Sequence, residues 1–297
     1  MNSLKLVSFG TPGNWVGGIL RGDEVISLTH CAALIGWSDV SSVRSALDTG
    51  VPEDLDARIA SVVDELHRNG HVKTLSDVRL APPIPDPEKI ICIGLNYHDH
   101  ADEVGAEPPK DPIFFAKYAN SLIGPYDNIV PPRDTQKVDY EAELAVVIGK
   151  PGRYIDPEDA LDHVAGAMVL NDVSARDLQL ANQLWTGGKA IDTFAPCGPW
   201  LTLAEDAGNL MDLPVTTTVN GDVLQNGNTR NMIFGVAEVI AFLSRIMTLR
   251  PGDIIATGTP AGVAASHDPA RFLNPGDLVE VEVGGLGALS NPVAEPV

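Results

Sequence analysis

The stretch VDYEAELAVVIG, residues 138–149, predicts a core strand that begins with a polar site. Its second half, LAVVI, has no polar break and is typical of a buried β-strand. Its first half places Asp139, Glu141 and Glu143 two residues apart, and side chains alternate along a strand, so we expect all three on one face. Because burying an unpaired carboxylate is costly, buried acids are paired, protonated or bound to a cation.

Asp172 follows the predicted strand GAMVLN and is a third candidate ligand beside Glu141 and Glu143. Glu141 and Glu143 are expected about 7 Å apart from strand geometry. Three carboxylates without a cysteine form an all-oxygen site, which suits Mg²⁺, Mn²⁺ or Ca²⁺ better than zinc or copper. The alternative is a strand whose acids face water, the interpretation that we prefer for VEVEV at 279–283.

Composition limits the class of protein. The 297 residues favour one large domain with a smaller appendage, and 40 acids against 20 bases give a net charge of −20. Because phosphate contacts require clusters of Lys and Arg, nucleic acid is excluded as a partner. The apolar runs are too short to cross a membrane, and MNSLKLVSFG does not resemble a signal peptide, so we expect a soluble, cytoplasmic protein. Cys31, Cys92 and Cys197 are expected to be small buried hydrophobes.

The N-terminal part has its own pattern. Short alternating runs in 1–48 predict antiparallel strands, and apolar spacing over 51–70 predicts a helix. Four prolines in APPIPDPEK, 81–89, indicate a boundary. We therefore expect a small N-terminal domain over 1–80 and a main domain over 81–297.

The main domain is predicted to consist mostly of strands and turns. Strands are expected within 90–97, 138–149, 163–174, 215–228, 251–263 and 275–293. Asn220-Gly221 is a strong hairpin signal, and 231–248 has the apolar spacing of one helix. No βαβ alternation occurs, so we expect a β-rich α+β fold and no doubly wound sheet.

Other polar residues suggest chemistry only weakly when each is considered alone. In GLNYHDHADEVG, His100 and Glu103 are spaced i,i+3 on one face of a predicted helix, where a carboxylate raises the basicity of an imidazole, although a surface pair is the alternative. Lys189 follows two glycines and is a candidate oxyanion stabiliser or a surface lysine. Thr259 in TGTPAGV is a candidate hydroxyl donor within a loop whose glycines allow close approach of a ligand.

Together the motifs are specific. The order NYxxHxxE, DYEAELAVVIG, NDVSARDLQ, GKxxDTFxPxGPW and GTPAGV closely resembles the fumarylacetoacetate hydrolase family over roughly residues 85–293. The resemblance implies a rolled mixed β-sheet, a small N-terminal α/β domain, a homodimer, and a Mg²⁺ or Mn²⁺ site.

The resemblance also assigns residues. It implies that the metal ligands are Glu141, Glu143 and Asp172. It implies that the catalytic residues are His100, Glu103 and Lys189, and that the substrate-binding residues are Gln179, Thr259 and Arg176. Asp139 is not carried over as a ligand and is expected to support the site or to lie at the surface. Pocket shape is expected to depend on Tyr118, Trp185, Arg176 and the loop 104–112.

The resemblance implies hydrolysis of a carbon–carbon bond in an acylpyruvate such as fumarylpyruvate or maleylpyruvate, within aromatic catabolism. The same metal–enolate chemistry serves two alternatives: decarboxylation of oxaloacetate-type acids, and isomerisation or tautomerisation of acids such as 2-hydroxyhepta-2,4-diene-1,7-dioate. A third alternative is a non-catalytic β-module stabilised by Ca²⁺, which would leave His100 and Lys189 unexplained.

Overall fold

A large mixed sheet forms the centre of the computed structural model, which describes residues 4–181 and 183–297. The strands of this sheet follow the order β4-β3-β2-β1-β12-β10-β9-β15-β5-β6, and β7 pairs with β12. Most neighbours are antiparallel, whereas β15 with β5 and β12 with β7 are parallel. Its strands are β1 Leu4–Thr11, β2 Asn14–Arg21, β3 Glu24–Ser27, β4 Val72–Thr74, β5 Ile90–Gly94, β6 Ile113–Lys117, β7 Leu122–Ile123, β9 Ala142–Ile148, β10 Val164–Asn171, β12 Ala195–Leu203 and β15 Ile254–Ala256. The predicted β-rich α+β class is confirmed.

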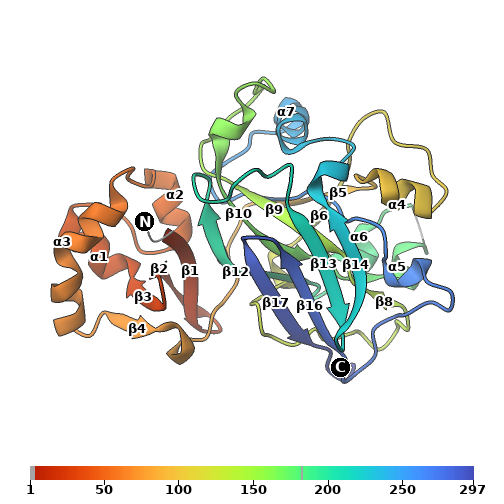
Figure 1. Cartoon of the computed structure of the whole chain (residues 1–297), viewed down its shortest axis with the longest axis horizontal. Helices are drawn as coiled ribbons and strands as arrows, with labels where there is room; N and C mark the ends of the chain where they lie inside the picture. The colour runs from red at the N-terminus through yellow and green to blue at the C-terminus, as the bar shows by residue number, and fades with distance from the viewer. Residues whose placement is uncertain (1–3, 182) are drawn as a thin grey trace.

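The N-terminal strands extend this sheet at one end, and helices cover them (Figure 1). The helices are α1 Leu28–Ile35, α2 Val43–Thr49 and α3 Leu55–Arg68. The last matches the helix predicted over 51–70, whereas α1 and α2 lie in a region predicted as strands. Strand β1 pairs with β12, joining Lys5 to Thr202 and Leu6 to Leu201, so the sheet continues from the N-terminal part into the main part.

A second sheet covers one face of the first. Its order is β14-β13-β16-β17, with β13 Pro214–Val219, β14 Asp222–Asn228, β16 Leu278–Val283 and β17 Gly287–Pro292. The predicted hairpin between β13 and β14 turns at Asn220 and Gly221, both with positive φ, which is the geometry that twisted hairpins favour. The acids of VEVEV, Glu280 and Glu282, face solvent as expected.

Strand β9 shows why this sheet is buried on both faces. Leu144, Val146 and Ile148 pack toward the second sheet and helix α7, Val236–Ile246. Ala145 and Val147 pack on the opposite face, in the core that also contains the N-terminal residues. The unbroken apolar run is therefore a strand with two covered faces.

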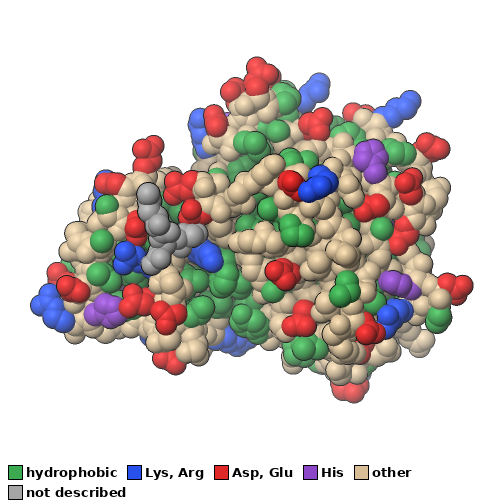
Figure 2. Space-filling view, viewed as in Figure 1, with side chains coloured by type: hydrophobic (Ala, Val, Ile, Leu, Met, Phe, Trp, Pro, Cys, Tyr) green, Lys and Arg blue, Asp and Glu red, His purple; other side chains and the backbone are tan. Residues whose placement is uncertain are grey.

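The remaining elements are short and lie near the end of β9. They are β8 Val138–Asp139, β11 Ser174–Ala175, α4 His98–Glu103, α5 Arg176–Gln179 and α6 Thr186–Lys189. Helix α7 begins later than predicted, because Thr229–Asn231 forms a 3-10 turn and the side chain of Glu238 caps the backbone N–H of Gly235. The three cysteines are buried and free, as expected. No helix within the described ranges is long and apolar enough to cross a membrane. Acidic side chains are spread across the face shown in Figure 2.

Candidate metal and 2-oxo acid site

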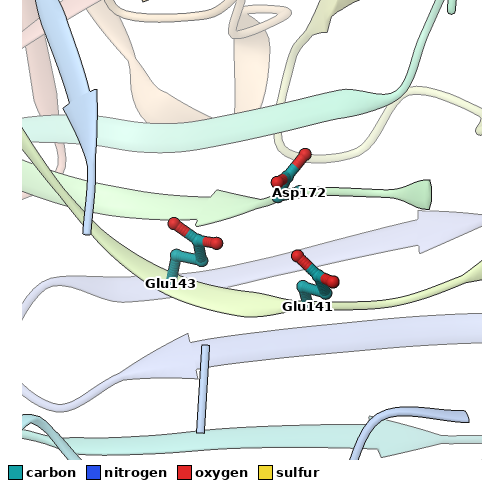
Figure 3. Close-up of side chains that lie close together, drawn as sticks. All are labelled: Glu141, Glu143 and Asp172. Carbon is teal, nitrogen blue, oxygen red and sulfur yellow. The ribbon is translucent and has the colours of Figure 1, made fainter. Parts of the chain in front are cut away.

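Three carboxylates converge where β9 and β10 meet. Antiparallel pairing sets Leu170 opposite Glu143, and Asp172 directly follows β10. One carboxylate oxygen from each of Glu141, Glu143 and Asp172 lies within 4.8 Å of the other two, and all three residues are buried (Figure 3). These oxygens are hard donors, so the group suits a divalent cation such as Mg²⁺, Mn²⁺ or Ca²⁺.

The acids do not lie on one continuous strand, so that prediction needs correction. Pairing is interrupted at Tyr140 and Glu141, between β8 and β9. There the Glu141 N–H donates to the side chain of Asn171 instead of a strand neighbour. Asp139, at the end of β8, is not part of the carboxylate trio. It accepts hydrogen bonds from Arg176 and from the backbone N–H groups of Ala264 and Ala265.

Asp139 is fully buried, so the surface alternative for this residue is wrong. Arg176 Nε donates to Asp139 at 2.8 Å, and its Nη2 lies 2.7 Å from Glu141 Oε1. Asp139 therefore orients the guanidinium that pairs with Glu141, which fits the expected supporting role.

Two buried lysines also contact the carboxylates. Lys189 Nζ donates to Glu141 Oε2 at 2.6 Å and to Asp172 Oδ2 at 2.8 Å. Lys117 Nζ, at the end of β6, donates to Asp172 Oδ1 at 2.6 Å and to the carbonyl of Val173. Both oxygens of Asp172 thus accept from an ammonium group.

The charges of this cluster do not balance. The carboxylates of Asp139, Glu141, Glu143 and Asp172 face the cations Lys117, Arg176 and Lys189. When all seven are ionised, one negative charge is in excess. A divalent cation would change the net charge of the cluster from one negative to one positive charge. The carboxylate of a 2-oxo acid would then bring the net charge to zero. The residues present therefore fit both a divalent cation and an anionic ligand.

The pKa values locate the excess on Glu143. Burial, together with the charges of Asp172 and Glu141, raises the pKa of Glu143 well above its ordinary value. Burial also acts on Glu141, but the charges of Lys189 and Arg176 outweigh it and hold the pKa of Glu141 at about 2. Burial opposes the charge of Lys189, yet Asp172 and Glu141 raise its pKa, so Lys189 remains an ammonium donor at neutral pH.

His100 and Glu103 form the predicted pair on α4. His100 Nδ1 lies 3.0 Å from Glu103 Oε2, while Glu103 Oε1 accepts from the N–H of Gly262 at 2.8 Å. The same glycine-rich loop donates the N–H of Gly258 to Glu143 at 2.8 Å. One loop therefore contacts both the histidine–glutamate pair and a predicted metal ligand.

Gly258 has a structural reason to be glycine. Its φ is +97°, and a Cβ there would lie 2.8 Å from Cβ of Asn96. The buried Asn96 side chain donates to the carbonyls of Thr257 and Phe234, and accepts from the N–H of Phe234. A larger residue at 258 would displace the loop that holds Glu143.

Several of these groups line a cavity of about 310 Å³, whereas Asp172 and Glu103 are not among its lining residues. Its polar lining residues include the predicted residues His100, Glu141, Glu143, Arg176, Gln179, Lys189 and Thr259. Its apolar lining includes Ile93, Leu95, Val104, Ala106, Phe115, Leu180 and Trp185. Trp185, Arg176 and part of the loop 104–112 shape the cavity as expected, whereas Tyr118 is exposed and is absent from the lining within the described chain.

Two functional candidates were missed from sequence. Lys117 ends the strand IFFAK, and a charge that closes an apolar run is a signal that sequence reading can use. Gln225 lies in β14, and its side chain donates to the hydroxyl of Thr259 at 2.8 Å. Nothing in the local sequence near Gln225 indicates that contact.

Comparison with known proteins identifies the family. The family model described as "Fumarylacetoacetate (FAA) hydrolase C-terminal" matches residues 89–294. The chain belongs to the fumarylacetoacetate hydrolase family. A relative in Xenopus laevis, named as a mitochondrial oxaloacetate tautomerase, is 46% identical over 240 residues, covering 80% of this chain and 75% of that protein.

Solved structures of this family agree with the fold. Fumarylacetoacetate hydrolase of Exiguobacterium antarcticum is 35% identical, with a TM-score of 0.83 and coverage of 99% of this chain and 100% of that chain. Maleylpyruvate hydrolase of Sphingobium sp. SYK-6, solved with manganese(II) and pyruvate, is 31% identical, with a TM-score of 0.76 and coverage of 99% and 100%.

The comparisons confirm some predictions and correct others. The chain is an enzyme of the fumarylacetoacetate hydrolase superfamily, but the predicted class of carbon–carbon hydrolase is not confirmed, because the Xenopus laevis relative is named as a tautomerase. The predicted purely cytoplasmic location is contradicted, since that relative is named as mitochondrial. The roles of individual site residues, the domain division and the homodimer stay predictions.

Proposed function

We propose that the chain is a divalent-metal-dependent tautomerase that interconverts the keto and enol forms of oxaloacetate or a similar 2-oxo acid. One observation carries the proposal: His100, oriented by Glu103, lines the same cavity as Glu141 and Glu143 of the buried carboxylate trio. The name of the Xenopus laevis relative supports the choice of oxaloacetate.

Glu141, Glu143 and Asp172 would hold Mg²⁺ or Mn²⁺. When bound, this ion would supply Lewis-acid stabilisation of negative charge on the 2-oxo oxygen. The manganese and pyruvate in the Sphingobium hydrolase structure support a cation of this kind and a 2-oxo acid ligand.

His100 would move the proton. With Nδ1–H donating to Glu103, Nε2 is the basic nitrogen, and it would accept a proton from C3 of the keto acid. Returning that proton to the oxygen at C2 completes the conversion to the enol, and the reverse order gives the keto form. Lys189, held as an ammonium group, would donate to the oxygen on which negative charge develops.

Apolar residues would exclude bulk water from the reaction. Phe115 and Trp185 pack edge to face with centroids 5.6 Å apart, and Lys189 Nζ lies 5.1 Å from the Phe115 ring centroid. Electrostatic interactions strengthen where water is excluded, so this wall would increase the effect of Lys189 on a developing oxyanion.

Hydrolysis of an acylpyruvate is the second candidate. The same His100–Glu103 pair is suited to deprotonate water, and maleylpyruvate hydrolase is a structural neighbour. We also propose a homodimer, as the resemblance implies, which light scattering of the purified protein tests.

Product analysis separates the candidates. Metal-loaded protein is incubated with oxaloacetate and with fumarylpyruvate, while enol absorbance, carbon dioxide and NMR signals of the products are followed. The proposal expects accelerated loss of enol-oxaloacetate absorbance without pyruvate release. Pyruvate release from fumarylpyruvate with no effect on the oxaloacetate enol would instead support the hydrolase.

A further inference from the structure

Gln225 is a fully buried amide whose side chain makes four hydrogen bonds. Its Nε2 donates to Thr259 Oγ1 at 2.8 Å and to the carbonyl of Pro260 at 2.9 Å. Its Oε1 accepts from the N–H of Ala142 at 3.0 Å and from Thr217 Oγ1 at 2.7 Å. Both amide hydrogens and both lone pairs are therefore used.

The orientation of this amide is determined by its neighbours. The carbonyl of Pro260 can only accept, so the nitrogen must face it. The N–H of Ala142 can only donate, so the oxygen must face that side. A flipped amide would break both contacts and leave buried backbone groups unsatisfied, which is costly.

This orientation determines what Thr259 can do. The Thr259 hydroxyl accepts from Gln225, so its own proton is left to point elsewhere. Within the described residues no acceptor for that proton is recorded, and Thr259 lines the cavity that contains Glu141 and Glu143. The hydroxyl therefore presents a donor to whatever enters the cavity.

We propose that Gln225 is a positioning residue that makes Thr259 an obligate hydrogen-bond donor to an anionic oxygen of the 2-oxo acid. The proposal rests on the proposed function for the identity of that ligand. Gln225 also fixes the distance between Thr259 and the predicted metal ligands, because its Oε1 accepts from the backbone N–H of Ala142, which lies between Glu141 and Glu143. One side chain thus sets the donor and the predicted metal ligands at a constant separation.

The central test reverses the donor at Gln225. Gln225→Glu keeps the shape and the acceptor for Ala142 and Thr217, but an ionised carboxylate can no longer donate to Thr259. The hydroxyl of Thr259 must then donate to the new carboxylate and not to the ligand. Thr217→Val is the matched control, since it removes one hydrogen bond of Gln225 and leaves the Thr259 contact intact.

Oxalate is the probe, since it is a stable analogue of a 2-oxo acid and its binding requires no turnover. Calorimetry with Mn²⁺-loaded protein is expected to show oxalate binding about 10- to 100-fold weaker in Gln225→Glu and Thr259→Val, the loss typical of a hydrogen bond to a charged acceptor. Thr259→Ser, which keeps the hydroxyl, and Thr217→Val should bind within about threefold of wild type. Mn²⁺ affinity should change little in Thr259→Val, Thr259→Ser and Thr217→Val, whereas the added carboxylate of Gln225→Glu should leave Mn²⁺ bound at least as tightly as in the wild type.

A double variant adds a further requirement. Gln225→Glu with Thr259→Val should bind oxalate no more weakly than Thr259→Val alone, because both changes remove the same donor. Additive losses, equal losses in Thr217→Val, or wild-type oxalate affinity in Gln225→Glu would each overturn the proposal. If Gln225→Glu does not fold, Gln225→Met removes the donor without a charge and must show the same non-additivity with Thr259→Val.

The two proposals fail separately. If the oxalate pattern holds but the protein does not accelerate enol-oxaloacetate conversion, Gln225 has its role and the assigned reaction is wrong. If conversion is accelerated but Gln225→Glu binds oxalate normally, the reaction stands and this inference is wrong.

Discussion

Removing the Lys117 ammonium provides a severe test of the charge arrangement. Lys117 is 1% exposed and lies 2.6 Å from Asp172 Oδ1, so Lys117→Met leaves a buried carboxylate oxygen without its partner. Breaking a buried pair from one side typically costs about 3–5 kcal/mol. At roughly 2 °C per kcal/mol for a chain of this size, the metal-free melting temperature should fall by about 6–10 °C.

The same substitution should increase the stabilisation that bound Mn²⁺ gives to the folded protein. It raises the excess negative charge of the cluster by one, so bound Mn²⁺ should stabilise Lys117→Met more than it stabilises the wild type. Scanning calorimetry with a chelator and with saturating Mn²⁺ measures both shifts. Lys110→Met is the control, because Lys110 is exposed, and its unfolding free energy should change by less than about 0.5 kcal/mol. If metal-free Lys117→Met is as stable as Lys110→Met, the Lys117–Asp172 pair does not stabilise the folded protein.

Three other predictions concern the same site. His100→Ala should lower turnover by about 10²- to 10⁴-fold while Mn²⁺ affinity is retained, and turnover that survives this substitution excludes His100 as the base. Burial and the neighbouring acids raise the pKa of Glu143 above its ordinary value of 4.5, so the metal-free folded state holds the extra proton. The stability of the metal-free protein should therefore fall as pH rises from 4.5 through that raised pKa. Mn²⁺ binding should release up to one proton from the wild type and none from Glu143→Gln, which calorimetry in buffers of different ionisation enthalpy measures. A Cβ at Gly94 would lie 2.3 Å from Trp185, so Gly94→Ala should cost about 1–3 kcal/mol and raise KM, and unchanged tryptophan fluorescence would contradict the contact.

Sequence predicted best where the pattern was local. The run LAVVI of β9 is apolar on both faces because both faces are covered, and its length and composition alone identify a strand. The pair His100–Glu103 was predictable because i,i+3 spacing on a helix brings the side chains together. Helix α1 was missed because its buried residues, Leu28, Cys31 and Ala32, span barely one turn beside strand-like alternation.

Long-range contacts were beyond such patterns. Lys117 contacts Asp172 although the two residues are 55 positions apart, and no local pattern in the sequence links the end of β6 to the end of β10. Gln225 reaches Thr259 across the packing of two sheets, and no period in the sequence records that packing. Asp139 lies outside the carboxylate trio because strand pairing is interrupted between β8 and β9, and nothing in the sequence 138–149 indicates that interruption.

A metal titration of turnover tests most directly whether the reaction depends on a cation at the carboxylate trio. Metal-free protein is titrated with Mn²⁺ while the conversion of enol-oxaloacetate is followed by absorbance, and Glu143→Gln is measured in parallel. We expect no acceleration in chelator, saturation at about one Mn²⁺ per chain, and loss of the response in Glu143→Gln. Full acceleration in chelator, or an undiminished response in Glu143→Gln, would contradict a metal-dependent reaction at this carboxylate trio.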